Sequence, residues 1–169
     1  TPKISIFNMP LTEPSSKGDL LTLPARSPGQ IIQDLKYAEE KFKDINIKFC
    51  LDSIRFVTPQ RKPINTTTDL ATYRDPIEAE KEDCVTIYYI FRGLGTSYWA
   101  GISNMPWQSD RRITLLGSCD SASLVHEFGH YFGLYHTFGA DDYVDDTPEM
   151  DSAFEFGSDL GIGSLGVKD

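Results

Sequence analysis

The chain has 169 residues, enough for one domain with a hydrophobic core. It is 40% hydrophobic and 24% charged, as ordinary globular proteins are, and no apolar run reaches the roughly 20 residues of a membrane helix. Nine acidic residues and one lysine in residues 140–169 contribute −8 to a net charge of −9. The composition therefore argues against nucleic-acid partners and against membrane insertion. Basic peptides, bound Ca²⁺ or a solvated tail would each account for the acidic charge.

The first part of the chain predicts a strand, a loop and a helix. Residues 4–9 form an apolar run with strand character that a proline ends. Residues 13–26 are rich in Pro, Ser and Gly and predict a loop with a short extended piece at 20–23. A Ser-Pro pair is typical of a helix start, and the apolar stripe after it predicts a helix over residues 28–43 that packs on a sheet.

The middle of the chain predicts two strands separated by a long loop. Residues 45–57 are rich in Ile, Phe and Val and predict a strand that bends near residues 52–53. Residues 58–82 are polar, contain three prolines and predict an insertion loop. Residues 85–91 are apolar on both faces, which predicts a central strand of the sheet.

The last elements complete the predicted fold. Residues 97–103 form a weaker strand interrupted by Gly101, and residues 112–116 form a fifth strand. A helix is expected over residues 121–134, with Asp120 or the serine after it as N-cap. The pattern predicts an α+β domain, in which a twisted, mixed five-stranded sheet carries a backing helix and a second helix that bears the candidate site.

All three histidines lie in the run H-E-F-G-H-Y-F-G-L-Y-H, residues 126–136. His126 and His130 are four residues apart, so on a helix they share one face and can bind one Zn²⁺. Gly133 is placed to end the helix in a left-handed turn that brings His136 back as a third ligand. Three protein ligands leave one position open for water, as catalytic zinc sites do.

Glu127 lies between the first two histidines and is the candidate general base. A carboxylate beside a metal can take a proton from an attacking water and pass it to a leaving amine. A lone H-E-x-x-H pair could equally be two surface histidines of a helix. The longer pattern fixes five positions with a role for each, so we expect metal-dependent hydrolysis without a covalent intermediate.

The cysteines Cys50, Cys84 and Cys119 lack C-x-x-C spacing, which excludes zinc-knuckle and thioredoxin sites. One disulfide with one free thiol, and three thiols, both remain open.

The histidine pattern is the zinc signature of the metzincin metalloproteases. The runs H-E-x-G-H-x-x-G-L-x-H-T-F and D-x-V-D-D-T-P resemble the pappalysin family of metzincins, as do residues 45–51, and the resemblance covers 45–51 and 84–149. It implies a secreted zinc endopeptidase with one catalytic domain over residues 1–169. An upper subdomain would span residues 1–133 and a short, irregular lower subdomain residues 134–169.

The resemblance also implies a substrate strand that pairs antiparallel with the edge strand at residues 97–103. It implies structural Ca²⁺, for which the acidic residues 141–146 are the candidate ligands. Met150 is either the methionine of a shortened turn beneath the metal or an exposed loop residue. The tyrosine expected near that methionine is absent, and Tyr143 would be a weak substitute.

The expected function is that of a monomeric, zinc-dependent endopeptidase acting on protein or peptide substrates. One alternative is a catalytically weak zinc-binding interaction module of the same fold. A second alternative is a zinc hydrolase that acts on a smaller substrate. Because the chain begins at Thr1 rather than Met, we expect that a signal or pro-segment has been removed.

Overall fold

The computed structural model describes residues 2–8, 11–14, 20–56, 84–91, 100–109 and 111–137. Five strands form one sheet in the order β4-β1-β5-β7-β6, with β4, β1, β5 and β7 parallel and β6 antiparallel to β7. Their bounds are Lys3–Asn8 (β1), Cys50–Phe56 (β4), Cys84–Ile90 (β5), Gly101–Ser103 (β6) and Arg112–Leu116 (β7). The predicted α+β class and mixed five-stranded sheet are confirmed, and β5 is the central strand as expected.

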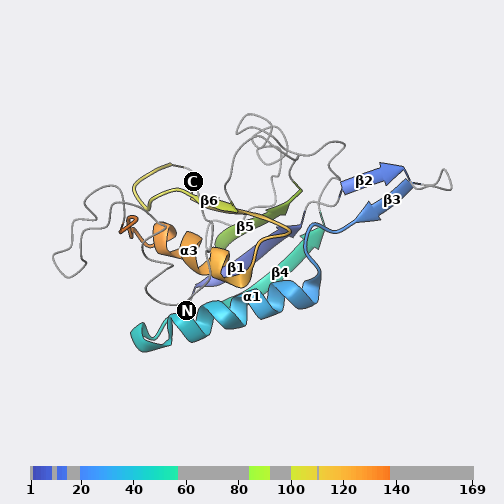
Figure 1. Ribbon diagram of the computed structural model, residues 1–169. Coiled ribbons are helices and arrows are strands. Elements are labelled where there is room, and N and C mark those ends of the chain that lie inside the picture. Colours follow the sequence, from blue (N-terminus) through green and yellow to red (C-terminus); the bar gives the residue numbers. More distant parts are fainter. Residues whose placement is uncertain are drawn as a thin grey trace, which may run out of the picture.

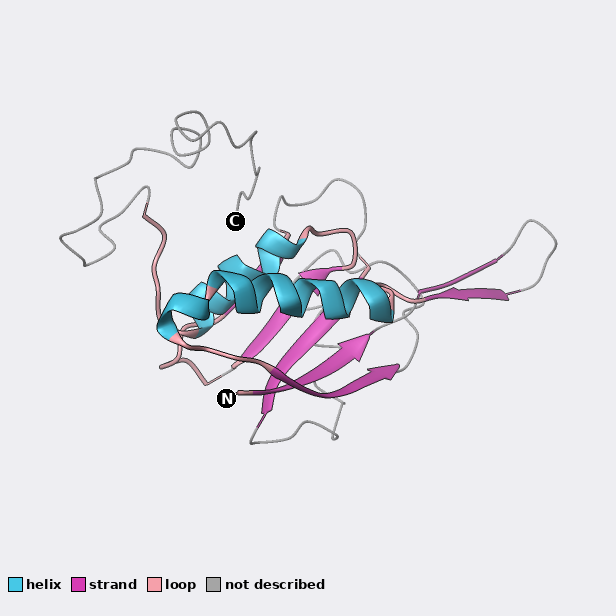
Figure 2. Cartoon of the chain, turned by 90° about the horizontal axis from the view of Figure 1, so that it is seen from below, coloured by secondary structure: helices cyan, strands magenta, loops and turns pink. Residues whose placement is uncertain are grey.

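Two helices, α1 (Pro28–Lys41) and α3 (Ser121–Tyr131), lie on the same face of this sheet (Figures 1 and 2). Ser27 caps α1 through a capping box with Gln30, which is why the helix begins where the Ser-Pro pair predicts. The core lies between helices and sheet and is formed largely by residues that are 0% exposed: Ile4, Ile6, Ile31, Ala38, Ile87, Tyr89, Ile113, Leu115, Leu124 and Phe128.

The structure differs from the prediction around the first helix. A 3₁₀ turn, η1 (Lys43–Ile45), follows α1, and Asn46 adopts a left-handed conformation with φ of 56°. Asparagine tolerates this conformation better than most residues, and the turn it makes delays the next strand to Cys50. The prediction that strand structure begins at residue 45 is therefore wrong. Apolar residues before Cys50 do pack in the core, but their backbone is not part of a strand. Phe49, for example, stacks on Phe128 with ring centroids 4.4 Å apart.

Two further details of the chain concern its strands. The bend predicted near residues 52–53 is a β-bulge, since Ile4 pairs with Leu51 while the next residue, Ser5, pairs with Ser53. Strands β2 (Leu11–Pro14) and β3 (Leu20–Leu23) form an antiparallel hairpin that extends away from the main sheet (Figure 1). The loop predicted over residues 13–26 was thus only partly right, because Ser and Gly lie in the connection at 15–19, whereas Pro14 ends strand β2 itself.

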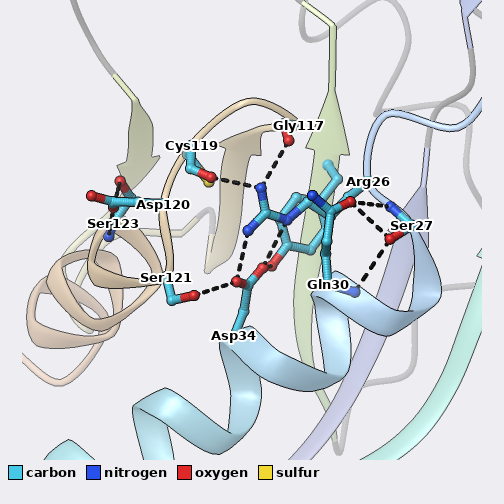
Figure 3. Close-up of polar contacts among 10 residues, drawn as sticks. Arg26, Ser27, Gln30, Asp34, Gly117, Cys119, Asp120, Ser121 and Ser123 are labelled. Atoms are coloured by element: carbon cyan, nitrogen blue, oxygen red, sulfur yellow. Dashed lines mark hydrogen bonds and ion pairs between the residues drawn. The ribbon is translucent and has the colours of Figure 1, made fainter.

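A buried polar cluster fixes the start of α3 (Figure 3). The Arg26 guanidinium forms two hydrogen bonds to Asp34, of 3.0 and 2.7 Å, and donates to the carbonyls of Gly117 at 3.0 Å and Cys119 at 2.6 Å. Asp34 also accepts hydrogen bonds from the hydroxyls of Ser121, at 2.7 Å, and Tyr89, at 2.9 Å. Burial lowers the pKa of Arg26, but the hydrogen bonds and charge of Asp34 outweigh it, so the pKa is raised. The cluster ties α1 and β5 to the turn from which α3 begins.

The strand register decides between the two cysteine alternatives. Cys50 of β4 and Cys84 of β5 both pair with Lys3, on opposite sides of β1. Two strand spacings separate them by roughly 10 Å, which exceeds the ~7 Å limit for the Cα atoms of a disulfide. Cys119 follows β7 at the other end of the parallel strands. No disulfide therefore joins any two of the three cysteines.

Candidate metal centre

Helix α3 carries part of the candidate site and is capped at both ends by local hydrogen bonds. The Asp120 side chain accepts a hydrogen bond from the Ser123 backbone amide at 2.9 Å, so Asp120 is the N-cap. At the other end, Leu134 N donates to Gly129 O and Gly133 N donates to His130 O, both at 2.9 Å. These two bonds form a Schellman motif around Gly133, whose φ is +99°. The left-handed turn predicted at Gly133 is confirmed, although the helix ends at Tyr131 and not at residue 134.

This turn brings the three histidines together. The Nε2 atoms of His126 and His130 lie 3.0 Å apart, those of His130 and His136 2.9 Å, and those of His126 and His136 3.1 Å. Three ring nitrogens that approach one point form a group able to hold a metal ion. All three side chains are partly exposed, so the group stands at the surface and not inside the core.

The orientation of His130 is fixed by its other ring nitrogen. His130 Nδ1 donates a hydrogen bond to the Leu134 carbonyl at 2.8 Å. A carbonyl only accepts, so the proton is on Nδ1 and the Nε2 lone pair faces the other two histidines. A second hydrogen bond of this kind is the usual means by which proteins orient a metal-binding imidazole.

Glu127 follows His126 in α3 and, unlike the histidines, is buried, with 1% exposure. The side chain fits between α3 and the edge strand β6, where its Cγ and Oε1 atoms adjoin Gly101. Its Oε2 atom is buried, and no group in the described ranges donates a hydrogen bond to that atom, although the residue makes other interactions. The carboxylate is therefore confined between α3 and β6.

An exposed aromatic surface, which the sequence did not single out, flanks the histidines. The rings of Trp107 and Tyr135 are 5.8 Å apart by their centroids, and the residues are 62% and 42% exposed. Gly133 approaches Trp107 and Pro106, which joins the chain after β6 to the turn that bears His136. Only tertiary contact creates this surface, because its members come from separate elements.

Several predicted features lie outside the described residues. These are the insertion loop at 58–82, the acidic residues 141–146, Tyr143, Met150 and the part of the predicted edge strand before residue 100. Within residues 100–109 the edge strand itself is present as β6. The described helices include none long and apolar enough to cross a membrane.

Comparisons with known proteins agree with this geometry. A stretch of 34 residues is 62% identical to an extracellular metalloprotease of Pyricularia oryzae, and one of 34 residues is 61% identical to an extracellular metalloprotease of Neurospora crassa. Each match spans 17% of this chain and 12% of the relative's length. The fold is similar to a chain in the structure of a chaperone–substrate complex, with a TM-score of 0.51 and 15% identity over 83% of this chain and 25% of that chain. That last likeness concerns the fold alone.

In the described part of the chain, a mixed sheet carries α1 and α3 on one face, and two histidines of α3 converge with a third just after it; together with the family match, this defines a metallopeptidase domain of the metzincin type. Residues 29–137, more than half of the chain, match the reprolysin-like metallopeptidase family M12B, and the chain belongs to that family.

Proposed function

We propose that this chain is a zinc-dependent endopeptidase that hydrolyses peptide bonds with metal-activated water. The observation that carries the proposal is the convergence of three histidine Nε2 atoms within 3.1 Å of one another, at the end of the helix that also carries the buried Glu127. Membership of a metallopeptidase family supports a protein or peptide substrate.

The donor set fits zinc. Nitrogen ligands at about 2.0–2.1 Å from a tetrahedral Zn²⁺ lie roughly 3.3 Å apart, and the observed separations of 2.9–3.1 Å are within about 0.4 Å of that value. In neutral imidazoles each Nε2 atom either donates or accepts a hydrogen bond, and His130 Nε2 accepts. At least two of the three atoms are then of the same kind, so hydrogen bonds cannot join all three pairs. A shared cation satisfies all three.

The proposed roles follow from these positions. His126, His130 and His136 would hold the zinc and leave one position open. When bound, zinc would polarise the scissile carbonyl and lower the pKa of water toward about 7. The Glu127 carboxylate accepts a proton from the attacking water and delivers it to the leaving amine. Its burial between α3 and β6 keeps that carboxylate in one place through both transfers.

The edge strand β6 gives the substrate a place to bind. Among the described strands, β6 pairs only with β7, so it is an edge strand, and it also packs against α3, the helix that bears His126 and His130. An extended peptide can add to such an edge by backbone hydrogen bonds, largely independent of its side chains. We propose that substrates bind antiparallel to β6 and pass over the histidine group.

Further parts of the proposal rest on the sequence resemblance. The first is a pappalysin-like specialisation of the family. The second is a division into an upper subdomain over residues 1–133 and a lower subdomain over 134–169, in which Met150 would form the turn beneath the metal. The third is structural Ca²⁺ at residues 141–146. The chain would act as a monomer. It would act outside the cell, and the names of its relatives, which are extracellular metalloproteases, support that location.

The proposal is tested by metal analysis and cleavage of a mixed peptide library on one preparation. We expect one zinc per chain, cleavage by the wild type, and loss of cleavage with a zinc chelator. Glu127→Gln should keep the zinc and lose at least about 10²-fold in kcat. Glu40→Gln is the matched control, since Glu40 is an exposed residue of α1. One zinc per chain without cleavage would replace the proposal with the alternative of a zinc-binding interaction module.

A further inference from the structure

Gly101, the first residue of β6, is a glycine whose backbone does not require one. Of the glycines in the described part of the chain, Gly133 alone has a positive φ. Gly101 pairs with Leu115 of β7 in ordinary strand geometry. A glycine inside a strand often marks a place where another group approaches the backbone closely.

That group is Glu127. A Cβ atom at position 101 would lie 2.7 Å from both Cγ and Oε1 of Glu127, and 2.8 Å from Cδ2 of Leu115. Carbon atoms that are not bonded have their optimal separation near 3.5–4.0 Å, so an alanine here forces a neighbour to move. Both side chains are buried, but the two closest atoms belong to Glu127. The Glu127 carboxylate is the group that would be displaced first.

We propose that Gly101 is a positioning residue for catalysis, whose missing side chain provides the space that the Glu127 carboxylate occupies. The same absence lets the edge strand approach α3 closely, so the proposed peptide-binding edge and the general base stand side by side. This inference rests on the proposed role of Glu127 in peptide hydrolysis.

The inference makes different predictions for zinc binding, KM and kcat, three properties that a general structural defect would change together. The three atoms nearest to the Cβ position of residue 101 belong to Glu127 and Leu115 and not to a histidine, so zinc binding should survive an alanine there. Peptide binding along β6 uses backbone groups, so KM should change little. A misplacement of a catalytic group by about 1 Å can cost about 10²-fold in rate, so kcat should fall.

The experiment compares Gly101→Ala with Gly29→Ala, a matched control in α1 where a Cβ meets nothing within 4 Å. We expect Gly101→Ala to bind one zinc with an affinity within about threefold of wild type and to give an unchanged visible spectrum with Co²⁺. Its kcat on a fluorogenic peptide should fall roughly 30- to 100-fold with KM within about threefold. Wild-type kcat in Gly101→Ala would overturn the inference.

A second readout does not depend on activity. Gly101→Ala should lower Tm by about 5 °C in the wild type and by clearly less in Glu127→Ala, which lacks Cγ and Oε1. Equal losses in the two backgrounds would overturn the inference, because the crowding would then lie elsewhere. If Gly101→Ala does not fold, the comparison is made in Leu115→Val, which lacks the Cδ2 atom that lies 2.8 Å from the new Cβ.

The two proposals fail in different ways. If the zinc-loaded wild type cleaves no peptide, the endopeptidase function is wrong, and the difference in Tm alone decides whether Gly101 accommodates Glu127. If the wild type cleaves and the Glu127→Gln variant does not, the function stands whatever Gly101→Ala shows.

Discussion

At the scale of single residues, Cys119 shows how burial changes the chemistry of a side chain. It lies in the turn between β7 and α3, is 9% exposed, and its carbonyl accepts a hydrogen bond from Arg26. Burial, opposed in part by the charge of Arg26, raises the pKa of the Cys119 thiol from 9.0 to about 12. At neutral pH the thiol is therefore protonated and a poor nucleophile or metal ligand.

This shift predicts a loss of stability in alkali. The pKa of the Cys119 thiol is higher in the folded chain than in the unfolded chain. Its contribution to the free energy of unfolding is therefore fully present below about pH 9 and is lost as the pH rises toward 12. At pH 10.5 the wild type should have lost about 2 kcal/mol through this group, a loss that Cys119→Ala cannot show. Thermal unfolding at pH 7 and pH 10.5 measures the difference. Equal losses of Tm in both proteins would contradict it.

At the scale of elements, the turn after α3 decides whether the third histidine reaches the other two. An alanine at position 133 would hold a left-handed φ at a cost of about 1–2 kcal/mol, and its Cβ would lie 3.3 Å from Pro106. We expect Gly133→Ala to weaken zinc binding by at least about tenfold, because relief of the strain moves His136. Competition with a metal-sensitive dye measures the affinity.

The control for that turn is Gly129→Ala, in the same helix. A Cβ at position 129 meets only Leu134, at 3.8 Å, and alanine favours a helix by up to about 1 kcal/mol over glycine. Zinc affinity should therefore stay near that of the wild type. A similar loss in both variants would show that the left-handed turn is not the cause.

The start of the same helix depends on the buried pair Arg26–Asp34. Arg26→Met leaves the Asp34 charge buried without its cation, which should cost about 3–5 kcal/mol. The exposed pair Lys43–Glu40 is the control, and Lys43→Met should change the free energy of unfolding little, because solvent screens an exposed pair. Denaturant unfolding measures both. If Arg26→Met costs no more than the surface variant, the cluster does not stabilise the junction of α1 and α3.

These elements also show what the sequence could and could not predict. The convergence of the three histidines was predictable because its parts are close in sequence: the four-residue spacing follows from helix geometry, and Gly133 marks the turn that returns His136. The surroundings of Glu127 were not predictable, since they depend on the contact between β6 and α3. In the sequence, Gly101 gave only the general signal of a glycine within a strand. The Arg26–Asp34 cluster escaped notice because Arg26 stands in a Pro- and Ser-rich stretch and meets the 117–119 turn only in the folded chain.

At the scale of the whole molecule, the candidate metal centre and the hydrophobic core are separate. The core joins α1, α3 and the sheet and contains none of the three histidines, which are partly exposed and lie in the second half of α3 and in the segment after it. The fold therefore does not depend on the metal in the way that a small zinc domain does. Zinc would add stability only through its preference for the folded state.

Removal of the metal should accordingly lower Tm without unfolding the protein. Binding to the folded state at a free concentration of 1,000 Kd adds about 4 kcal/mol, which corresponds to roughly 8–16 °C for a chain of this size. We expect the chelated protein to keep its far-ultraviolet circular dichroism at 25 °C and to melt lower by that amount, with full recovery when zinc is restored. His136→Ala should melt close to the chelated wild type and respond little to chelator. A chelated protein without helical signal at 25 °C would mean that the core described here is insufficient by itself and that the histidine group holds α3 in place.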